Sequence, residues 1–169
     1  TGRRVVVIGG GATGIETALL LAETGTLSGD ELKFLLVNGA VVPDKLYKLA
    51  TEGTKEVVVV EMAETLGANF GKSTRWGMLQ DINRYGVKTL VQAKVLEITD
   101  GGVKIEHGGE VRELPADHVV LAVGTRSANP LQQVAEELGI GFKVVGDALA
   151  PATVFEANHQ GYNAGRSIA

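Results

Sequence analysis

The sequence predicts an α/β protein with a Rossmann-like, three-layer fold. Short runs of β-branched residues, such as VVVI at residues 5–8, are typical of strands buried on both faces of a parallel sheet. A glycine motif separates this run from an apolar helical pattern. Further along the chain, three alternating segments joined by glycine-rich turns indicate a β-meander. We therefore expect a central parallel sheet with a β-meander crossover and a helical-hairpin insertion.

The glycine motif is the feature that most directly indicates a function. Gly9, Gly11 and Gly14 have the spacing G-x-G-x-x-G between a strand and a helix, which is the context in which this motif binds a dinucleotide. The first glycine allows a tight turn, the second lets the backbone approach a pyrophosphate, and the third lets the helix pack closely. The positive end of the helix then faces the phosphates. The alternative is a glycine-rich turn that binds nothing.

An insertion follows the first helix, at residues 26–54. Ser28 and Glu31 have the spacing of a capping box, and Pro43 suits the first turn of a second helix that ends near Gly53. We expect two short helices that form a hairpin over one edge of the sheet, as a packing decoration of the domain.

The second buried strand, EVVVVE at residues 56–61, ends in an acid. Glu61 lies where dinucleotide-binding units place the acid that binds the adenosine ribose. Its offset from the last glycine is 61 − 14 = 47 residues instead of about twenty, and the insertion accounts for the excess. A carboxylate here repels a 2′-phosphate, and residues 62–71 contain no Arg or Lys. This pattern favours NADH over NADPH, while a solvated strand end is the alternative.

The middle of the chain continues the alternation of helix and strand. Residues 71–85 predict a helix capped by Ser73 or Thr74, in which Trp76 suits a core or an interface better than a cofactor contact. Residues 87–90 predict the third parallel strand. The segments of the meander are expected at residues 93–99, 103–107 and 110–114.

The last part of the chain predicts two more strands and two helices. Residues 117–124 form a buried strand that ends at Gly124, at the carboxyl edge where open α/β sheets bind ligands. Pro130 starts a short helix. A further strand is expected at residues 142–147 and a long helix at residues 151–168.

Composition limits the classes of partner. The 169 residues carry a net charge of −4, and this acidic balance argues against nucleic acid or an anionic membrane surface. Without cysteine the chain has no disulfide, thiolate nucleophile or cysteine-held cluster. The histidines show no metal-ligand spacing, and no catalytic acid–base pair stands out. We expect no metal, no catalytic residue, no nucleic-acid or membrane partner, and a cytoplasmic location.

Taken together, the motifs resemble the NAD(P)H domain of the pyridine-nucleotide-dependent flavoprotein superfamily. The resemblance covers nearly the whole chain and is carried by VVVIGGGATGIETA at residues 5–18, the strand ending in Glu61, VVLAVG at residues 119–124 and VVGDA at residues 144–148. The helical insertion and the run STRWG at residues 73–77 are most similar to the C-terminal part of the NADH:flavin oxidoreductase / 2,4-dienoyl-CoA reductase / 2-enoate reductase group.

This resemblance implies a place in a longer enzyme. In that group hydride passes from NAD(P)H to FAD, and electrons then cross an iron–sulfur cluster to FMN, which reduces an activated alkene. Residues 1–139 would be the NAD(H)-binding domain. Residues 140–169 would be the returning strand and helix of an FAD-binding domain whose other parts lie elsewhere in the polypeptide. FMN and the cluster are expected outside this chain, and the isolated chain is expected to be inactive.

The resemblance also implies roles for single residues. The glycine motif would hold the NADH pyrophosphate and Glu61 the adenosine ribose. Gly124 would line the same cleft, and Asp147 would contact FAD. Glu16 would lie near the nicotinamide, although its spacing alone makes it only an acid in the first turn of a helix. The full set of expected cofactor-binding residues is Gly9, Gly10, Gly11, Ala12, Thr13, Gly14, Glu16, Glu61, Met62, Gly124 and Asp147.

Two other functions are compatible with the sequence. The chain can be a non-catalytic module that senses NAD(H), or a degenerate domain that retains only ADP. A redox-sensing repressor would also carry a basic helix-turn-helix, which this acidic chain lacks. The sequence leaves open the final electron acceptor and whether the protein is a homo-oligomer.

Overall fold

The computed structural model describes residues 2–68 and 70–168. It divides into two compact units, residues 1–123 and residues 124–169. The first unit contains both hydrophobic clusters of the described chain. The second contains two helices and the segments that join them.

A four-stranded parallel sheet forms the centre of the first unit, as the sequence predicts. Its strand order is β3-β2-β1-β7, and every neighbouring pair is parallel. The strand that precedes the glycine motif is therefore an inner strand of the sheet. The bounds of the strands are Arg4–Ile8 for β1, Glu56–Val60 for β2, Lys88–Leu90 for β3 and His118–Leu121 for β7.

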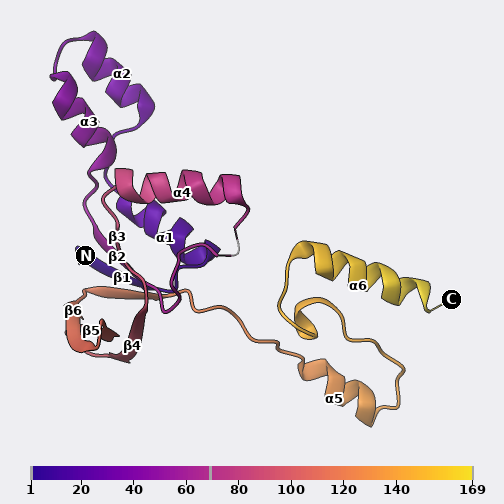
Figure 1. Ribbon diagram of the computed structural model, residues 1–169. Coiled ribbons are helices and arrows are strands. Elements are labelled where there is room, and N and C mark those ends of the chain that lie inside the picture. Colours follow the sequence, from indigo (N-terminus) through magenta and orange to yellow (C-terminus); the bar gives the residue numbers. More distant parts are fainter. Residues whose placement is uncertain (1, 69, 169) are drawn as a thin grey trace. The chain divides into compact units, whose positions relative to one another are not determined.

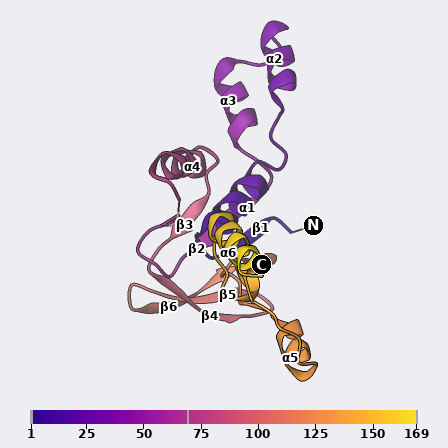
Figure 2. The same cartoon turned by 90° about the vertical axis from the view of Figure 1, so that its right-hand side faces the viewer.

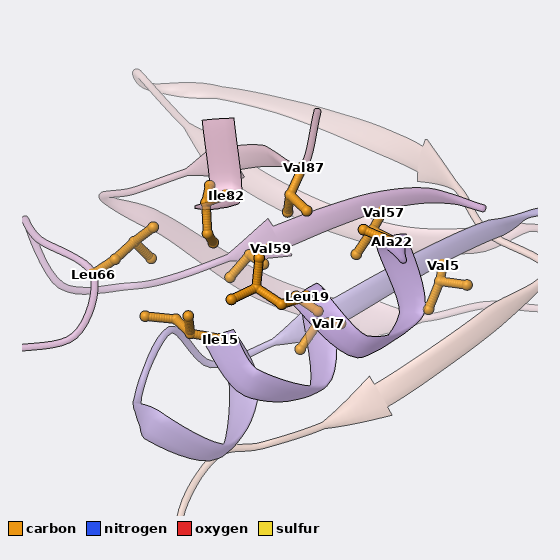
Figure 3. Packing of buried hydrophobic residues seen from close by; sticks show 11 residues of the cluster. Val5, Val7, Ile15, Leu19, Ala22, Val57, Val59, Leu66, Ile82 and Val87 are labelled. Carbon is orange, nitrogen blue, oxygen red and sulfur yellow. The ribbon is translucent and has the colours of Figure 1, made fainter. Parts of the chain in front are cut away.

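One face of this sheet packs against α1 (Ala12–Ala22) and α4 (Lys72–Arg84). Figure 3 shows Ile15 and Leu19 of α1 close to the valines of β1 and β2. Because each fully buried aliphatic side chain contributes about 1.5–3 kcal/mol, this cluster fixes α1 on the sheet. The buried members are Val5, Val7, Ile15, Ala18, Leu19, Ala22, Val57, Val59, Leu66, Ile82 and Val87.

The opposite face is covered by the predicted meander. β4 (Ala93–Ile98), β5 (Gly102–His107) and β6 (Glu110–Pro115) form an antiparallel sheet in that order. Its buried side chains Ala93, Val103 and Ile105 pack with Val6, Ile8 and Val60 of the parallel sheet. Helices, parallel sheet and meander make three layers, which Figure 2 shows from the side. The predicted fold class is confirmed.

The insertion forms the two predicted helices, α2 (Gly29–Val37) and α3 (Pro43–Thr51), with the predicted capping box of Ser28 and Glu31. Its predicted place over a sheet edge is wrong. Figures 1 and 2 show the hairpin projecting away from the sheet, and α2 has no buried residue. The hairpin is held at its base, where Thr24 O accepts a hydrogen bond of 2.8 Å from Thr54 N.

Helix α4 begins one residue before its predicted caps. Its N-cap is Gly71 and no side chain caps it, so the prediction of Ser73 or Thr74 as the cap is wrong because both residues already lie inside the first turn. Trp76 on this helix is 66% exposed. It is therefore not a core residue of this chain, and a role at an interface stays a prediction.

The second unit contains the two predicted helices, α5 (Pro130–Glu137) and α6 (Val154–Arg166), but not the predicted strand at residues 142–147. The chain there forms no ladder, and Gly146–Ala148 is a 3₁₀ turn, η1. A strand needs a neighbour for its N–H and C=O groups, and within residues 124–168 this segment has none. Instead, Gly146 N donates to Oε1 of Gln160 on α6 at 2.6 Å.

Candidate functional site

A pocket of about 390 Å³ lies at the carboxyl ends of β1 and β2, the edge where α/β sheets bind ligands. One wall is the glycine motif and the end of β2, a second is the start of β4, and a third is the segment that follows β7. The lining residues are Ile8, Gly9, Gly11, Val60, Glu61, Met62, Ala93, Lys94, Val95, Ala122 and Val123.

Two glycines of the motif, Gly9 and Gly14, are required by the backbone packing of the chain itself. Gly9 has φ +108°, and a Cβ there would lie 2.2 Å from the carbonyl oxygen of Ala122. A Cβ on Gly14 would lie 1.9 Å from the carbonyl oxygen of Gly9, and one on Gly10 would lie 2.3 Å from Cδ2 of Leu66. The tight turn and the close helix packing predicted for Gly9 and Gly14 are therefore present.

Gly11 differs from these glycines because nothing in the described chain requires it. Its φ is −76°, which any residue adopts, and a Cβ there would have no atom within 4 Å. It nevertheless lines the pocket, at the N-cap of α1. A Cβ at this position would stand in open space at the wall of the pocket. This space is where the motif is expected to bring its backbone close to a pyrophosphate.

The N–H groups available to such a ligand are fewer than the motif suggests. Gly9 N donates to Val60 O at 2.9 Å, and Gly10 N donates to Oε2 of Glu61 at 2.5 Å. The first four N–H groups of α1, from Gly11 through Ala12 and Thr13 to Gly14, have no partner within a helix by geometry, and no side chain caps them. The backbone N–H groups of the motif that are available to a phosphate are therefore those of residues 11–14.

Glu61 is half-buried and points at the glycine loop. Its Oε2 accepts from Gly10 N at 2.5 Å and its Oε1 accepts from Ala63 N at 2.7 Å. Two backbone donors thus hold the carboxylate in one orientation. An ionised carboxylate has about four acceptor positions, so it retains capacity for hydroxyl groups of a ligand in the pocket.

Lys94 is the charged residue of this pocket that the sequence did not predict. The other lining residues that were not predicted are Ile8, Val60, Ala93, Val95, Ala122 and Val123. Lys94 lies at the start of β4, 33 residues after Glu61, but Ala93 N donates to Glu61 O at 3.0 Å and brings the two segments together. For Ala122 and Val123 a usable signal was the expected end of the strand at residues 117–124 at the carboxyl edge of the sheet.

The other expected residues are distributed more widely. Met62 lines the pocket and is 72% exposed. Glu16 lies in the second turn of α1, not in the first as its spacing suggested, and it does not line the pocket. Gly124 and Asp147 belong to the second unit, where Asp147 accepts from Ala152 N at 3.4 Å. Their contact with a cofactor stays a prediction.

Neither a metal centre nor a membrane-spanning helix is found in residues 2–68 and 70–168. Within these ranges no three His, Asp or Glu side chains gather in a way that could hold a metal ion. No helix in the same part of the chain has the length and apolar character needed to cross a bilayer.

Comparison with known proteins identifies the family. The sequence pattern of the pyridine nucleotide-disulphide oxidoreductases matches residues 1–149. The chain belongs to this family. A metal reductase of Desulforamulus reducens is 46% identical over 162 residues, and a bilirubin reductase of Mediterraneibacter gnavus is 34% identical over 160 residues. The chain is thus part of an oxidoreductase. The resemblance to this superfamily that its motifs indicate is confirmed.

Solved structures agree with the family assignment. A 2-naphthoyl-CoA reductase in complex with 2-naphthoyl-CoA is 25% identical, with a TM-score of 0.66 over 97% of this chain and 21% of its own. Histamine dehydrogenase from Rhizobium sp. 4-9 shares the fold, with a TM-score of 0.71 over 99% of this chain and 23% of its own at 18% identity.

The chain covers only part of its relatives. It aligns over 96% of its own length with 24% of the metal reductase, and over 94% of its length with 20% of the bilirubin reductase. It therefore spans about a fifth to a quarter of the length of these larger redox proteins.

Proposed function

We propose that this chain is the NADH-binding domain of a flavin-dependent oxidoreductase, and that it presents NADH to an FAD held largely by other parts of the polypeptide. Electrons would continue through an iron–sulfur cluster and FMN outside this chain to an acceptor of the enoate or dienoyl type. The alternative that the domain only senses NAD(H) rests on no specific observation. A cytoplasmic location stays a prediction.

The open space at Gly11 is the observation that carries this proposal. The other motif glycines have a packing reason to lack a side chain, whereas Gly11 has only the pocket in front of it. Other glycines also have open space around them, but Gly11 has it at the wall of the pocket and at the motif position where the backbone approaches a pyrophosphate. The uncapped N-terminus of α1 next to it favours a negatively charged group, and the Glu61 carboxylate favours hydroxyl groups.

The residues of this chain would act by binding and orientation. The N–H groups of residues 11–14 would bind the diphosphate, and Glu61, already fixed by Gly10 and Ala63, would accept from the adenosine ribose. NADH supplies the hydride when bound. The protein supplies the geometry of its transfer, for which no proton-transfer residue of this chain is needed.

Titration of the 169-residue chain with NADH tests the proposal, and Gly71 provides a matched control. Gly11 and Gly71 are both N-cap glycines with extended backbones, and a Cβ added to either would have no atom within 4 Å. Gly11→Val is expected to weaken NADH binding at least roughly tenfold, or about 1.4 kcal/mol. Gly71→Val carries a similar helix-capping cost but is expected to bind NADH as the wild type does.

Two outcomes would overturn the proposal. One is an NADH affinity that is the same in Gly11→Val and in the wild type while both melt cooperatively. The other is equal affinity for NADH and ADP, which would indicate that the nicotinamide half makes no contact. Turnover is tested in the full-length protein, where Gly11→Val is expected to raise the KM for NADH.

A further inference from the structure

A second pocket lies at the other end of the parallel sheet, where the strands begin. Its volume is about 470 Å³, and it is bounded by the first residues of β1, β2 and β3, which are Arg4, Glu56 and Lys88, and by the last half of β6. It shares no lining residue with the cofactor pocket. The proposed function makes no use of it.

The floor of this pocket is apolar. Val58, Leu90 and Leu114 line it, and all three are half-buried at the margin of the cluster between the two sheets. The meander therefore leaves these three side chains only half-buried. An apolar part of a ligand that lies on this floor would bury the exposed apolar surface of these three side chains.

The charged residues around the floor are strongly biased toward one sign. The chain has 16 Lys and Arg residues and 20 Asp and Glu residues, yet the pocket is lined by four cationic side chains and one carboxylate. Such a gathering of cations in an acidic chain creates a locally positive field. The cationic residues are Arg4, Lys55, Lys88 and Arg112.

Ion pairs within the chain account for only part of this charge. Arg4 pairs with Asp117 at 2.6 Å, and Glu56 pairs with Arg3 at 3.1 Å. Among the described residues, Lys88 and Arg112 form no ion pair. They come from different sheets of the same unit, β3 and β6, and line one pocket. Nη2 of Arg112 lies 3.4 Å from Nδ1 of His107, so the other guanidinium N–H groups of Arg112 and the ammonium of Lys88 are available to an anion.

We propose that this pocket binds a small amphipathic anion, with a carboxylate or phosphate head at Lys88 and Arg112 and an apolar body on Val58, Leu90 and Leu114. Arginine and lysine beside an apolar floor recognise this combination, because the anion gains charge-assisted hydrogen bonds while the body leaves water. A wholly polar anion would leave the floor exposed, and a neutral apolar molecule would leave the cations unused.

Calorimetric titration of the 169-residue chain with octanoate, octyl phosphate, octanol and inorganic phosphate tests this site. The two amphipathic anions are expected to bind at least tenfold more tightly than octanol or inorganic phosphate. The stronger of the two identifies whether the natural head group is a carboxylate or a phosphate. Lys88→Gln and Arg112→Gln are each expected to weaken binding of the anions several-fold, whereas Lys33→Gln on α2, which does not line the pocket, leaves it unchanged.

The result is independent of the cofactor site. Saturating NADH is expected to leave octanoate binding unchanged, and Gly11→Val is expected to bind octanoate normally. Equal binding of octanoate and octanol would overturn the proposal. So would unchanged octanoate affinity in a Lys88→Gln variant that melts at the wild-type temperature, or competition between octanoate and NADH.

Discussion

The carboxylate of Glu61, at the end of β2, accepts a hydrogen bond of 2.5 Å from the backbone N–H of Gly10 in the glycine loop. The contact joins two segments that are 51 residues apart and sets the acid at the edge of the cofactor pocket. Glu61 therefore has a part in holding the loop as well as its proposed part in binding ribose. A useful substitution has to separate these two effects.

Glu61→Ala is expected to weaken NADH binding by about 1–2 kcal/mol, the scale of one charged hydrogen bond, which is roughly 5- to 30-fold in Kd. Glu61→Gln keeps one acceptor for the loop but removes the charge that repels a 2′-phosphate. Its NADPH affinity is expected to rise relative to its NADH affinity. Fluorescence titration with both nucleotides measures this ratio.

Glu64→Gln serves as the control for Glu61, because Glu64 is exposed in the loop after β2 and does not line the pocket. It is expected to keep the wild-type ratio of NADH to NADPH affinity. A wild-type ratio in Glu61→Gln would show that the carboxylate does not select the ribose.

Lys94 adds a cation to the wall of the same pocket. Lys94→Met retains most of the aliphatic chain and removes the charge, so NADH binding is expected to weaken by roughly two- to tenfold at low salt and less at high salt, because salt screens exposed charges. The measurement is the NADH Kd at two salt concentrations. Lys45→Met on α3 is the control, and an identical salt dependence in the two variants would contradict the prediction.

Asp117 gives the first unit a predictable dependence on pH. Its carboxylate accepts from the Arg4 guanidinium at 2.6 Å and from the backbone N–H groups of Arg4 and Arg3 at 2.8 and 2.7 Å. The hydrogen bond from the Arg4 side chain, followed by those from the two backbone groups, holds the pKa of Asp117 well below its usual range. These bonds join the start of β1 to the residue that precedes β7.

The direction of the pH effect follows from this lowered pKa. In the unfolded chain Asp117 takes up a proton near its ordinary pKa of about 3.9, whereas the folded chain keeps it ionised to lower pH. The stabilisation is therefore complete above that value and is lost as pH falls through the folded pKa. Asp117→Asn is expected to lower Tm at pH 7, and its difference from wild type is expected to shrink below about pH 4. Asp100→Asn, in an exposed turn, is the control for thermal melts over this pH range.

The parts of the fold that could be predicted are those in which local pattern and tertiary role agree. Strands β1 and β2 are rich in valine because strands buried on both faces of a parallel sheet favour β-branched residues. Positions 9 and 14 hold glycine because backbone atoms lie too close for a side chain. The segment at residues 142–147 has a strand pattern of the same kind but no neighbouring strand in the described part of its unit. Its sequence favours an extended strand, which forms only when a neighbouring strand supplies the hydrogen-bond partners.

In the candidate site, the residues that belong to the motif could be predicted, and those brought in by the folding of distant segments could not. Gly11 and Glu61 belong to a motif with fixed spacing, and both reach the pocket. Lys94 and Ala122 enter it through the register of β4 and the path of the chain after β7, which no local pattern specifies. The hydrogen bond from Gly10 N–H to Glu61, which makes this N–H unavailable to a ligand, could not be predicted either, because it depends on a side chain 51 residues away.

The helical hairpin is expected to be dispensable for NADH binding. Thr24 and Thr54 are joined by a hydrogen bond of 2.8 Å between their backbones, so a short turn of Gly25, Thr26 and Gly53 can connect them when residues 27–52 are deleted. The deleted segment lines no part of the cofactor pocket. The variant is expected to unfold cooperatively and to bind NADH within roughly twofold of the wild-type Kd. A loss of NADH binding in a folded variant would assign the hairpin a role in the site.

The two units are expected to differ in their capacity to fold alone. Every buried residue of the described chain lies in residues 1–123, and none of residues 124–168 is buried. Since burial of apolar surface offsets the conformational entropy of the chain, residues 1–123 are expected to melt cooperatively within about 5 °C of the full chain and to keep its NADH affinity. Residues 124–169 alone are expected to show little helical circular dichroism. Loss of NADH binding on truncation at residue 123 would instead place a binding residue, such as Gly124 or Asp147, in the second unit.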